Sequence, residues 1–427
     1  SETLGLLYAD HFPYRQFASA RGVRRSPIHR YLDAEGACFG EVAGWERANW
    51  FLPKSEKEKG KKAEYEYSWR RQNWFDYSAA EHMAVRQKVG MFDMSSFGKI
   101  KLIGRDAEAV LQIIAANDVA VPVGKIVYTQ FLNDDGHIEA DVTVTRLGPE
   151  EFLIVTPAAT IRRDLHWING HIPDQAHAIA IDVTVSESVL VVMGPEARSF
   201  LQPMIPQSLG NDDFPFGTMQ QIEIGHAVAR AHRVTYVGEL GWELYVSADM
   251  SAHVFEAIAE RRNDHPIAMC GLHALDSCRI EKGFRHFGHD ISSEDHVLEA
   301  GLGFAVKENK AQSKFGGMIG ADAVMAKRND GLSQRLMQFR LTDPDPLLYH
   351  NEAIYRDGAV IGYLTSGNYG HYLGGAIGLG YVKCNSIGET AESQLNAHYQ
   401  IDVAGKLVDA EVSLRPLYDP KALQVKL

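Results

Sequence analysis

Cysteine is scarce in this sequence and occurs in no metal-binding spacing. The 427 residues include four cysteines, and no two of them form a Cys-x-x-Cys pair: Cys38, Cys270, Cys278 and Cys384. Small secreted proteins depend on dense disulfides, and structural zinc sites need closely spaced ligands, so both classes are excluded. A set this sparse is typical of a reducing compartment, and we expect a cytoplasmic protein.

Long hydrophobic runs and an excess of positive charge are also absent. The longest apolar runs, such as Val189–Met193, have the length of a strand and fall far short of the ~20 residues that cross a bilayer. The 43 basic and 55 acidic residues give a net charge of −12 with neutral histidine. We therefore expect no membrane and no nucleic acid among the partners. Because the first residue is Ser rather than Met, we expect that the chain was processed or cut from a longer one.

The usual cofactor and nucleophile motifs are missing. The sequence has no Gly-x-Gly-x-x-Gly after a strand, no phosphate-binding Gly-x4-Gly-Lys-Ser/Thr, no Gly-x-Ser-x-Gly and no His-Glu-x-x-His. We therefore expect no FAD site in this chain. His286, His289 and Asp290 lie close together, but this spacing is common by chance and lacks a third spaced ligand, so we expect no metal site.

Composition divides the chain into three predicted parts. Residues 1–72 form an aromatic-rich segment with a solvated, mixed-charge loop at 53–62, residues 73–330 form an α+β core, and residues 331–427 form a β-barrel. The third part follows from a change after residue 331 to short strands separated by glycine-rich turns. The aromatic segment predicts either a docking surface for another protein or packing against this chain's own core.

Local signals place several elements in the core. Ser78 and Glu81 have the spacing of a capping box and predict a helix that begins there and runs through about residue 89. Residues 92–103 alternate like a strand, and residues 105–114 have helical periodicity. Two alternating runs, 127–132 and 137–147, flank Asn-Asp-Asp-Gly at 133–136, which predicts a β-hairpin.

Two acidic residues stand out by position. Asp141 alternates with Val142 and Val144, so it lies on the polar face of the second hairpin strand. It is either an exposed strand residue or a carboxylate that faces a pocket and accepts a proton from a substrate N–H. Glu239 lies between Gly238 and Gly241, which is the pattern of a presented acid or of a simple turn.

Six segments in a fixed order resemble the glycine cleavage T-protein (aminomethyltransferase) family. They are Val-Gly-Met-Phe-Asp-Met-Ser at 89–95, Tyr-Thr at 128–129 with Asp141 downstream, Arg-Val-Thr-Tyr-Val-Gly-Glu at 233–239, Arg-Ile-Glu-Lys-Gly at 279–283, Ile-Gly-Tyr-Leu-Thr-Ser-Gly at 361–367 and Gly-Leu-Gly-Tyr-Val at 378–382. Further segments at 11–14, 41–51 and 285–290 look like the folate-binding C-terminal half of dimethylglycine and sarcosine dehydrogenases. Those enzymes carry an N-terminal FAD domain, and we expect no such domain in this chain.

The resemblance implies a fold, a cofactor and a set of site residues. It implies an α+β ring of two interleaved, ferredoxin-like parts with a C-terminal β-barrel around a tetrahydrofolate site. Asp141 matches the catalytic aspartate, and Glu239 matches the acid that binds the pterin ring. Tyr128 and Phe97 match pterin-contacting positions, and Arg233 matches the arginine that opens the segment ending in Glu239.

From these matches we expect a tetrahydrofolate-dependent one-carbon transferase. It would capture the methylene group of an oxidised N-methyl amine, a small-molecule partner, as 5,10-methylenetetrahydrofolate, with an FAD-containing oxidoreductase subunit or domain as a further partner. Three alternatives stay open: a flavin-independent demethylase that transfers a methyl group to folate, a non-catalytic folate-binding regulatory subunit, and a lipoyl-dependent aminomethyltransferase.

Overall fold

The structure, a computed structural model, describes residues 2–427 and consists of two compact units. The first unit contains residues 2–96, Val185–Lys282 and Lys421–Leu427, and the second contains Phe97–Thr184 and Gly283–Pro420. Each unit is built from separate stretches of chain, so the two units are interleaved in sequence. They are described one at a time below.

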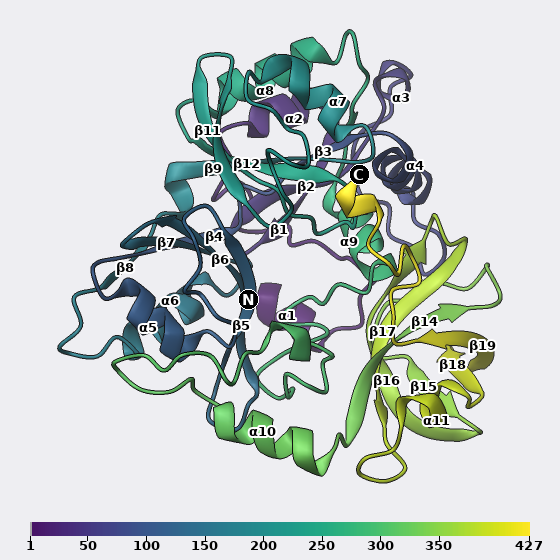
Figure 1. The fold of residues 1–427 in the computed structure, drawn as a ribbon. Helices are drawn as coiled ribbons and strands as arrows, with labels where there is room; N and C mark the ends of the chain where they lie inside the picture. Colours follow the sequence, from purple (N-terminus) through teal and green to yellow (C-terminus); the bar gives the residue numbers. More distant parts are fainter. Residues whose placement is uncertain (1) are drawn as a thin grey trace. The chain divides into compact units, whose positions relative to one another are not determined.

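The first unit is organised around a six-stranded sheet with strand order β10-β11-β12-β9-β3-β13. Its helices α7 and α8 contact β12 (Figure 1). Buried aliphatic and aromatic residues of the sheet and helices form one core, which includes Leu190, Phe200 and Trp242. The elements of this unit are α1 (Glu2–Tyr8), α2 (His29–Glu35), β1 (Ala37–Val42), β2 (Trp45–Phe51), α3 (Lys54–Glu58), α4 (Phe75–Gln87), β3 (Gly90–Asp93), β9 (Glu187–Met193), α7 (Ala197–Leu201), β10 (Met219–Ile224), β11 (Ala227–His232), β12 (Gly241–Ser247), α8 (Ser251–Arg261), β13 (Ala268–Met269) and α9 (Leu272–Glu281).

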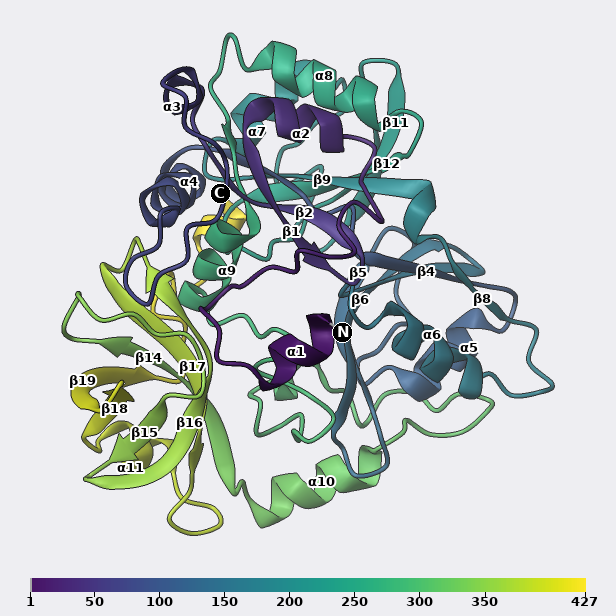
Figure 2. The same cartoon turned by 180° about the vertical axis from the view of Figure 1, so that it is seen from behind.

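The second unit begins with a five-stranded sheet with strand order β5-β6-β7-β4-β8. Its elements are β4 (Gly98–Ile103), α5 (Ala107–Ile114), β5 (Ile126–Leu132), β6 (Ile138–Gly148), β7 (Glu151–Thr156), α6 (Ile161–Gly170) and β8 (Ile179–Asp182). Helices α5 and α6 lie together on one side of this sheet, as the view from behind also shows (Figure 2). Val110 and Leu111 of α5 pack against Phe131 and Val142 in the core between helix and sheet. The other face of β5 and β6 is therefore the polar one.

The C-terminal part of the second unit is a closed six-stranded barrel with strand order β14-β17-β16-β15-β18-β19. It follows helix α10 (Ala321–Asp330) and includes the short helix α11 (Ala391–Leu395). Its strands are β14 (Gln334–Leu341), β15 (Ala353–Arg356), β16 (Ala359–Gly370), β17 (Gly375–Lys383), β18 (Tyr399–Val403) and β19 (Lys406–Ser413). The predicted fold class, α+β with a C-terminal β-barrel, is confirmed.

Much of the aromatic N-terminal segment packs against the core of its own unit. Ile28 and Phe51 belong to the same buried cluster as Leu190. Trp50 is fully buried beside Trp74 in a second cluster. Among the two readings of this segment, packing against the chain's own core therefore holds for residues 28–52.

Three local predictions need correction. Helix α4 begins at Phe75 rather than at Ser78, and no side chain forms a capping hydrogen bond at its start. Glu81, the predicted partner of Ser78 in the capping box, instead accepts the backbone N–H groups of Phe51 (2.7 Å) and Gly271 (2.8 Å). Residues 92–103 do not form one strand, since β3 and β4 belong to different sheets. The charged loop at 53–62 contains the short exposed helix α3.

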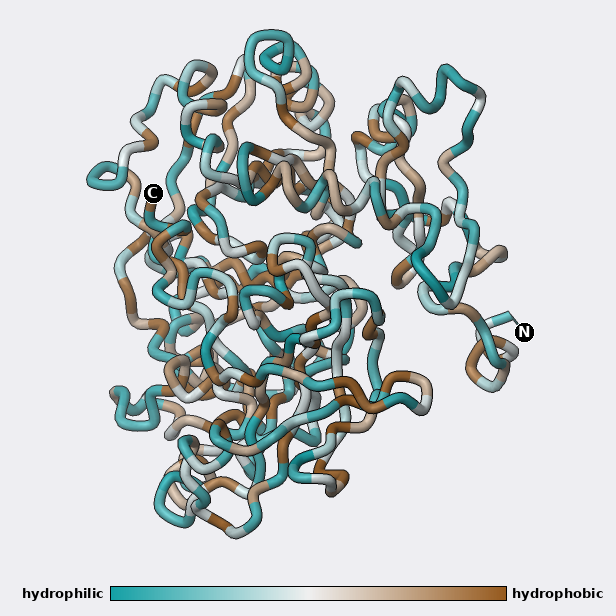
Figure 3. The backbone as a smooth tube through the Cα atoms, turned by 90° about the vertical axis from the view of Figure 1, so that its right-hand side faces the viewer, coloured by the Kyte–Doolittle hydropathy of each residue, from teal (hydrophilic) through white to brown (hydrophobic). Residues whose placement is uncertain are grey.

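Hydrophobic and hydrophilic stretches alternate over short distances along the whole backbone (Figure 3). Within residues 2–427, the helices are all too short or too polar to cross a membrane.

Candidate functional site

Asp141 lies on the polar face of strand β6. Along this strand Ala140, Val142 and Val144 are buried against the helices, whereas Asp141 and Thr143 point to the opposite face and keep partial exposure. This confirms the predicted alternation and positions Asp141 on the face that the helices leave uncovered. The hairpin turn uses Gly136 with φ of 75°, a conformation that glycine adopts without strain.

The carboxylate of Asp141 is held by neighbouring side chains of strand β5. Gln130 is directly opposite Asp141 in the ladder, and its Nε2 donates a hydrogen bond of 2.8 Å to Oδ1. Tyr128, two residues earlier on β5, also hydrogen-bonds the carboxylate. Opposite residues of an antiparallel pair share one face of the sheet, so the register itself brings these side chains together.

Burial of the carboxylate raises the pKa of Asp141 to about 6, and the hydrogen bonds from Gln130 and Tyr128 lower it in part. Arg285 also lowers the pKa, whereas the buried Asp164 on α6 raises it. A carboxyl group with a pKa near 6 exchanges protons close to neutral pH, which is the range that suits a general base. Asp141 is thus not the fully solvated strand residue of the simpler reading.

The aromatic ring of Tyr128 lies beside this carboxylate. The ring of Tyr128 stacks on Phe304, with centroids 6.2 Å apart and planes at 26°. Phe304 is 67% exposed, so the stack keeps an accessible aromatic surface. Phe97 lies in the bend just before β4 and is half-buried. A carboxylate acceptor beside an open aromatic surface suits a flat ligand that carries N–H groups.

Glu239 follows a tight loop of the first unit. The hydroxyl of Thr235 accepts the backbone N–H groups of Val237 (3.3 Å), Gly238 (3.0 Å) and Glu239 (3.2 Å). Gly238 has φ of 88°, and a side chain there would come within 2.8 Å of Lys282. This loop fixes the direction of Glu239, whose side chain is fully buried.

A buried charge network surrounds Glu239. Arg86 of α4 bonds Glu239 at 2.9 Å and Glu281 of α9 at 2.9 Å, and all three side chains are fully buried. His82 lies 3.2 Å from Glu281 and 3.4 Å from Cys278. Burial lowers the pKa of His82, but the neighbouring Cys278 and Glu281 outweigh this effect and raise the pKa to about 9. The buried guanidinium of Arg86 is thus paired with two buried carboxylates.

Arg233 makes contacts that stabilise its own unit. Its Nη1 donates 2.6 Å to the carbonyl of Phe214, and its guanidinium lies 5.8 Å from the ring centroid of Trp242. The side chain is 2% exposed, and burial lowers its pKa to about 10. These contacts are structural, and a role of Arg233 in folate binding stays a prediction.

The five predicted residues divide between the units. Asp141, Tyr128 and Phe97 lie in the second unit, where Asp141 and Tyr128 are hydrogen-bonded. Glu239 and Arg233 lie in the first. Sequence reasoning missed their direct partners, Gln130 and Arg86. A polar residue opposite Asp141 in the hairpin register was a signal for Gln130.

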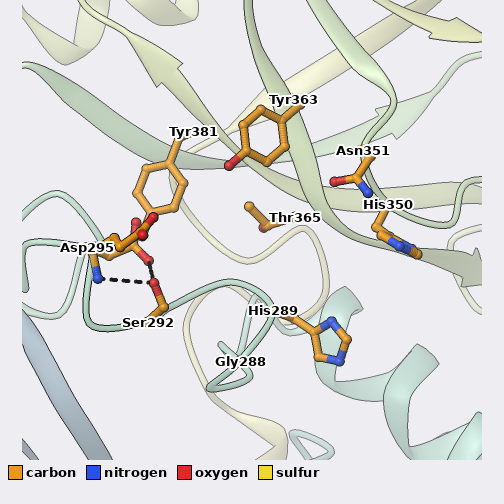
Figure 4. A pocket seen from close by; sticks show the side chains of 10 residues that line it. Gly288, His289, Ser292, Asp295, His350, Asn351, Tyr363, Thr365 and Tyr381 are labelled. Atoms are coloured by element: carbon orange, nitrogen blue, oxygen red, sulfur yellow. Dashed lines mark hydrogen bonds between the residues drawn. The ribbon is translucent and has the colours of Figure 1, made fainter. Parts of the chain in front are cut away.

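A polar pocket of about 250 Å³ lies within the second unit, between the 288–295 loop and the barrel (Figure 4). At one side Ser292 donates 2.9 Å to Asp295, and His289 and His350 lie toward the other side. None of the predicted site residues lines it; the lining is Gly288, His289, Ser292, Glu294, Asp295, His350, Asn351, Tyr363, Thr365 and Tyr381.

Asp290 of the histidine-containing loop serves the fold. It accepts the hydroxyl of Thr365 at 2.7 Å and the backbone N–H of His286 at 3.0 Å, which ties the loop to the barrel. Across residues 2–427, no group of three or more His, Cys, Asp and Glu side chains is arranged to hold a metal ion.

Comparison with known proteins defines the class. Residues 28–310 match the model of the GCVT N-terminal domain, and residues 334–419 match the glycine cleavage T-protein C-terminal barrel domain. The chain belongs to this aminomethyltransferase family. The fold agrees with that of the glycine cleavage system aminomethyltransferase T from Bartonella henselae, with a TM-score of 0.76 and 22% identity over 93% of this chain and 99% of that one.

Particular relatives are longer proteins. The chain is 40% identical over 425 residues to 4-methylaminobutanoate oxidase (formaldehyde-forming) of Paenarthrobacter nicotinovorans, covering 100% of this chain and 50% of the relative. It is 31% identical over 453 residues to mitochondrial sarcosine dehydrogenase of Homo sapiens, covering 98% of this chain and 49% of the relative. The chain thus spans about half the length of these curated relatives.

These matches confirm the resemblance and the class of enzyme predicted from the sequence, an aminomethyltransferase-type transferase related to the amine dehydrogenases. The boundaries predicted at residues 72/73 and 330/331, and the roles of the individual site residues, stay predictions.

Proposed function

We propose that this chain is a tetrahydrofolate-dependent transferase that captures the methylene group of an oxidised N-methyl amine as 5,10-methylenetetrahydrofolate. The observation that carries the proposal is Asp141, a partly buried carboxylate with a pKa of about 6 on the helix-free face of the sheet. Family membership supports the reaction class.

The residues around Asp141 suit a reduced folate. When bound, tetrahydrofolate supplies the amine nitrogens that accept the one-carbon unit. The Asp141 carboxylate would accept a hydrogen bond from such an N–H and then take its proton. Tyr128 and Phe304 offer the aromatic surface on which a flat ring or a benzoyl group stacks. A carboxylate acceptor beside an exposed aromatic surface thus supports tetrahydrofolate as the ligand.

Asp141 would have a second effect through its charge. At pH 7 a carboxyl group with a pKa of about 6 is mostly ionised. A fixed negative charge stabilises a cationic iminium group, and more strongly where water is excluded. Holding the two reactants in place contributes up to ~7–11 kcal/mol in favourable cases, and one acid–base group typically adds ~10²–10⁴-fold.

Glu239 is proposed to bind the pterin ring, whose amino and amide N–H groups form a matched donor pair. Its Thr235-based loop and its contact with Arg86 fix the carboxylate in one orientation. Phe97, half-buried before β4, is proposed as a further ring contact. Replacing Glu239 with Gln should weaken tetrahydrofolate binding, measured by calorimetry, whereas Glu223→Gln at an exposed position of β10 should not. Equal affinities of the two variants would remove Glu239 from the site.

The amine and its oxidant are proposed from the relatives. Their names specify oxidation of 4-methylaminobutanoate and of sarcosine, both N-methyl amino acids. We propose the same substrate class here, with the oxidation step performed by a flavoprotein subunit or domain. About half of each relative's sequence lies outside the region that matches this chain, which is long enough to contain such a domain.

The experiment is a transfer assay with the purified chain. An N-methyl amine oxidase generates the oxidised amine in the presence of tetrahydrofolate, and 5,10-methylenetetrahydrofolate is measured against free formaldehyde. The wild-type chain should raise the methylene product above the spontaneous background. Asp141→Asn should bind tetrahydrofolate within a few-fold of wild type and lose about 10²-fold or more of the catalysed rate.

The matched control is Asp134→Asn, an exposed aspartate in the turn of the same hairpin. It should transfer at the wild-type rate. Full activity of Asp141→Asn would contradict the proposal. A 5-methyl product would indicate direct methyl transfer, and folate binding without transfer by the wild-type chain would indicate a regulatory subunit.

A further inference from the structure

Gln130 occupies an unusual position for an amide side chain. It lies in strand β5, within the five-stranded sheet, and it is 0% exposed. Burying an amide costs free energy unless its donors and acceptors are bonded. The Nε2 atom is bonded to Asp141 at 2.8 Å, but the buried Oε1 atom has no hydrogen-bond partner. An apolar side chain would avoid this cost.

The orientation of the amide follows from its neighbour. If the amide were flipped, Oε1 would face the Asp141 carboxylate, and two acceptors would then be in contact without a proton between them. Donation from Nε2 to Asp141 Oδ1 is the arrangement that gives the ionised carboxylate a partner. The unbonded Oε1 is the cost of that arrangement, which is typical of residues that serve a site rather than stability.

We propose that Gln130 is a positioning residue for Asp141: its amide fixes the orientation of the carboxylate and favours the ionised form, which accepts a ligand N–H. The cross-strand register of Gln130 and Asp141 supplies the geometry. The consequence for catalysis rests on the proposed function, whereas the effect on the charge of Asp141 does not.

Other charged and titratable groups act on the same carboxylate and must stay constant in a test. Tyr128 of β5 and Arg285, in the segment after α9, favour the ionised form, and Asp164 of α6 disfavours it. Asp164 itself is held by the hydroxyl of Thr160 at 2.7 Å. A substitution at Gln130 alone leaves these three groups in place.

The experiment compares Gln130→Met with Gln112→Met in the full chain. Met has the length of Gln but no strong donor. Gln112 is the matched control because it too is buried, and its Nε2 donates 2.7 Å to a carboxylate, that of Asp118. Aspartate labelled with ¹³C at the side-chain carboxyl group is titrated by NMR, and the Asp141 signal is assigned by its absence in Asp141→Asn.

The wild-type Asp141 signal should titrate near pH 6. In Gln130→Met its midpoint should rise by about one unit, a tenfold change in the dissociation constant, because a hydrogen bond to the anion is lost. Gln112→Met should leave the midpoint unchanged. Gln130→Glu, which adds a nearby negative charge, should raise it further. An Asp141 midpoint that does not move in either Gln130 variant overturns the proposal.

Stability separates positioning from a structural role. At pH 4, where Asp141 is protonated, the melting temperature of Gln130→Met should equal or exceed that of wild type, because the unbonded Oε1 is removed. In the transfer assay, the acid limb of the pH profile should move up in parallel with the NMR midpoint. A variant that melts lower with an unmoved midpoint would show that Gln130 only supports the sheet. A wild-type chain without transfer activity would refute the proposed function and leave the NMR result standing.

Discussion

The raised pKa of Asp141 predicts how stability depends on pH. A carboxyl group that ionises near 3.8 in the unfolded chain and near 6 in the folded one disfavours folding once it is charged. The cost is absent below about pH 4, grows between pH 4 and 6, and is complete above pH 6. A difference of about two units at 1.36 kcal/mol each sets an upper limit of about 3 kcal/mol. Partial exposure of the residue reduces this, and we expect about 1–2 kcal/mol.

Asp141→Asn removes that charge while it keeps an oxygen to accept the Gln130 amide. The variant should therefore be more stable than wild type at pH 7.5 and equally stable at pH 4, measured as the thermal or urea midpoint at each pH. Asp134→Asn, in the exposed turn, should have the same stability as wild type at both pH values. A variant that is less stable than wild type at pH 7.5 would mean that the ionised carboxylate contributes to stability, and the argument for a strained, functional acid would fail.

Two further predictions concern the scaffold. Gly136→Ala should lower the stability by about 1–3 kcal/mol in urea unfolding, because Gly136 has φ of 75° and a Cβ atom there would lie 2.8 Å from His296. Glu389 pairs with Arg356 at 2.5 Å in the barrel, and this arginine overcomes desolvation to lower the pKa of Glu389 to about 2. The stabilisation by the Arg356–Glu389 pair is therefore present above about pH 4.5 and lost as the pH falls toward 2. Glu389→Gln should lower the melting temperature at pH 7 but have little effect near pH 2. A difference in melting temperature between variant and wild type that stays constant across this range would contradict the pairing.

Elements whose signals are local were predictable from the sequence. The hairpin of β5 and β6 follows from Asn-Asp-Asp-Gly between alternating runs, and the observed register confirms it. The alternation of Asp141 with Val142 and Val144 also predicted which face carries the acid. Both patterns depend on the pleat of a strand and on turn chemistry, which operate over a few residues.

Features that depend on distant contacts were not predictable. Ser78 and Glu81 have the spacing of a capping box, but Glu81 binds two backbone N–H groups from Phe51 and Gly271 instead. Residues 92–103 read as one strand because nothing local reveals that the chain changes sheet at 94–97. The pairing of strand β18 with β15 likewise joins residues that are far apart in the sequence.

The site shows the same division. Asp141 and Glu239 were identified by position and by family resemblance, and each has a buried partner that neither approach indicated. Arg86 is far from Glu239 in sequence, and only the packing of α4 beside this loop joins them. The hairpin register could have predicted that Gln130 lies opposite Asp141. An amide carries no charge, however, and its position in a strand does not by itself indicate a function.

The interleaving of the two units has a consequence for biosynthesis. The chain passes from one unit to the other at residues 96/97, 184/185, 282/283 and 420/421. The five-stranded sheet of the second unit comes from one continuous stretch, 98–182, and can pair its strands as soon as that stretch emerges from the ribosome. The first unit includes residues 421–427, where Leu427 accepts hydrogen bonds from Arg198 and Arg233, so these contacts form only after residue 427 has been made. Dividing the gene at any single codon would therefore split the first unit between two fragments, because this unit contains residues from both ends of the chain.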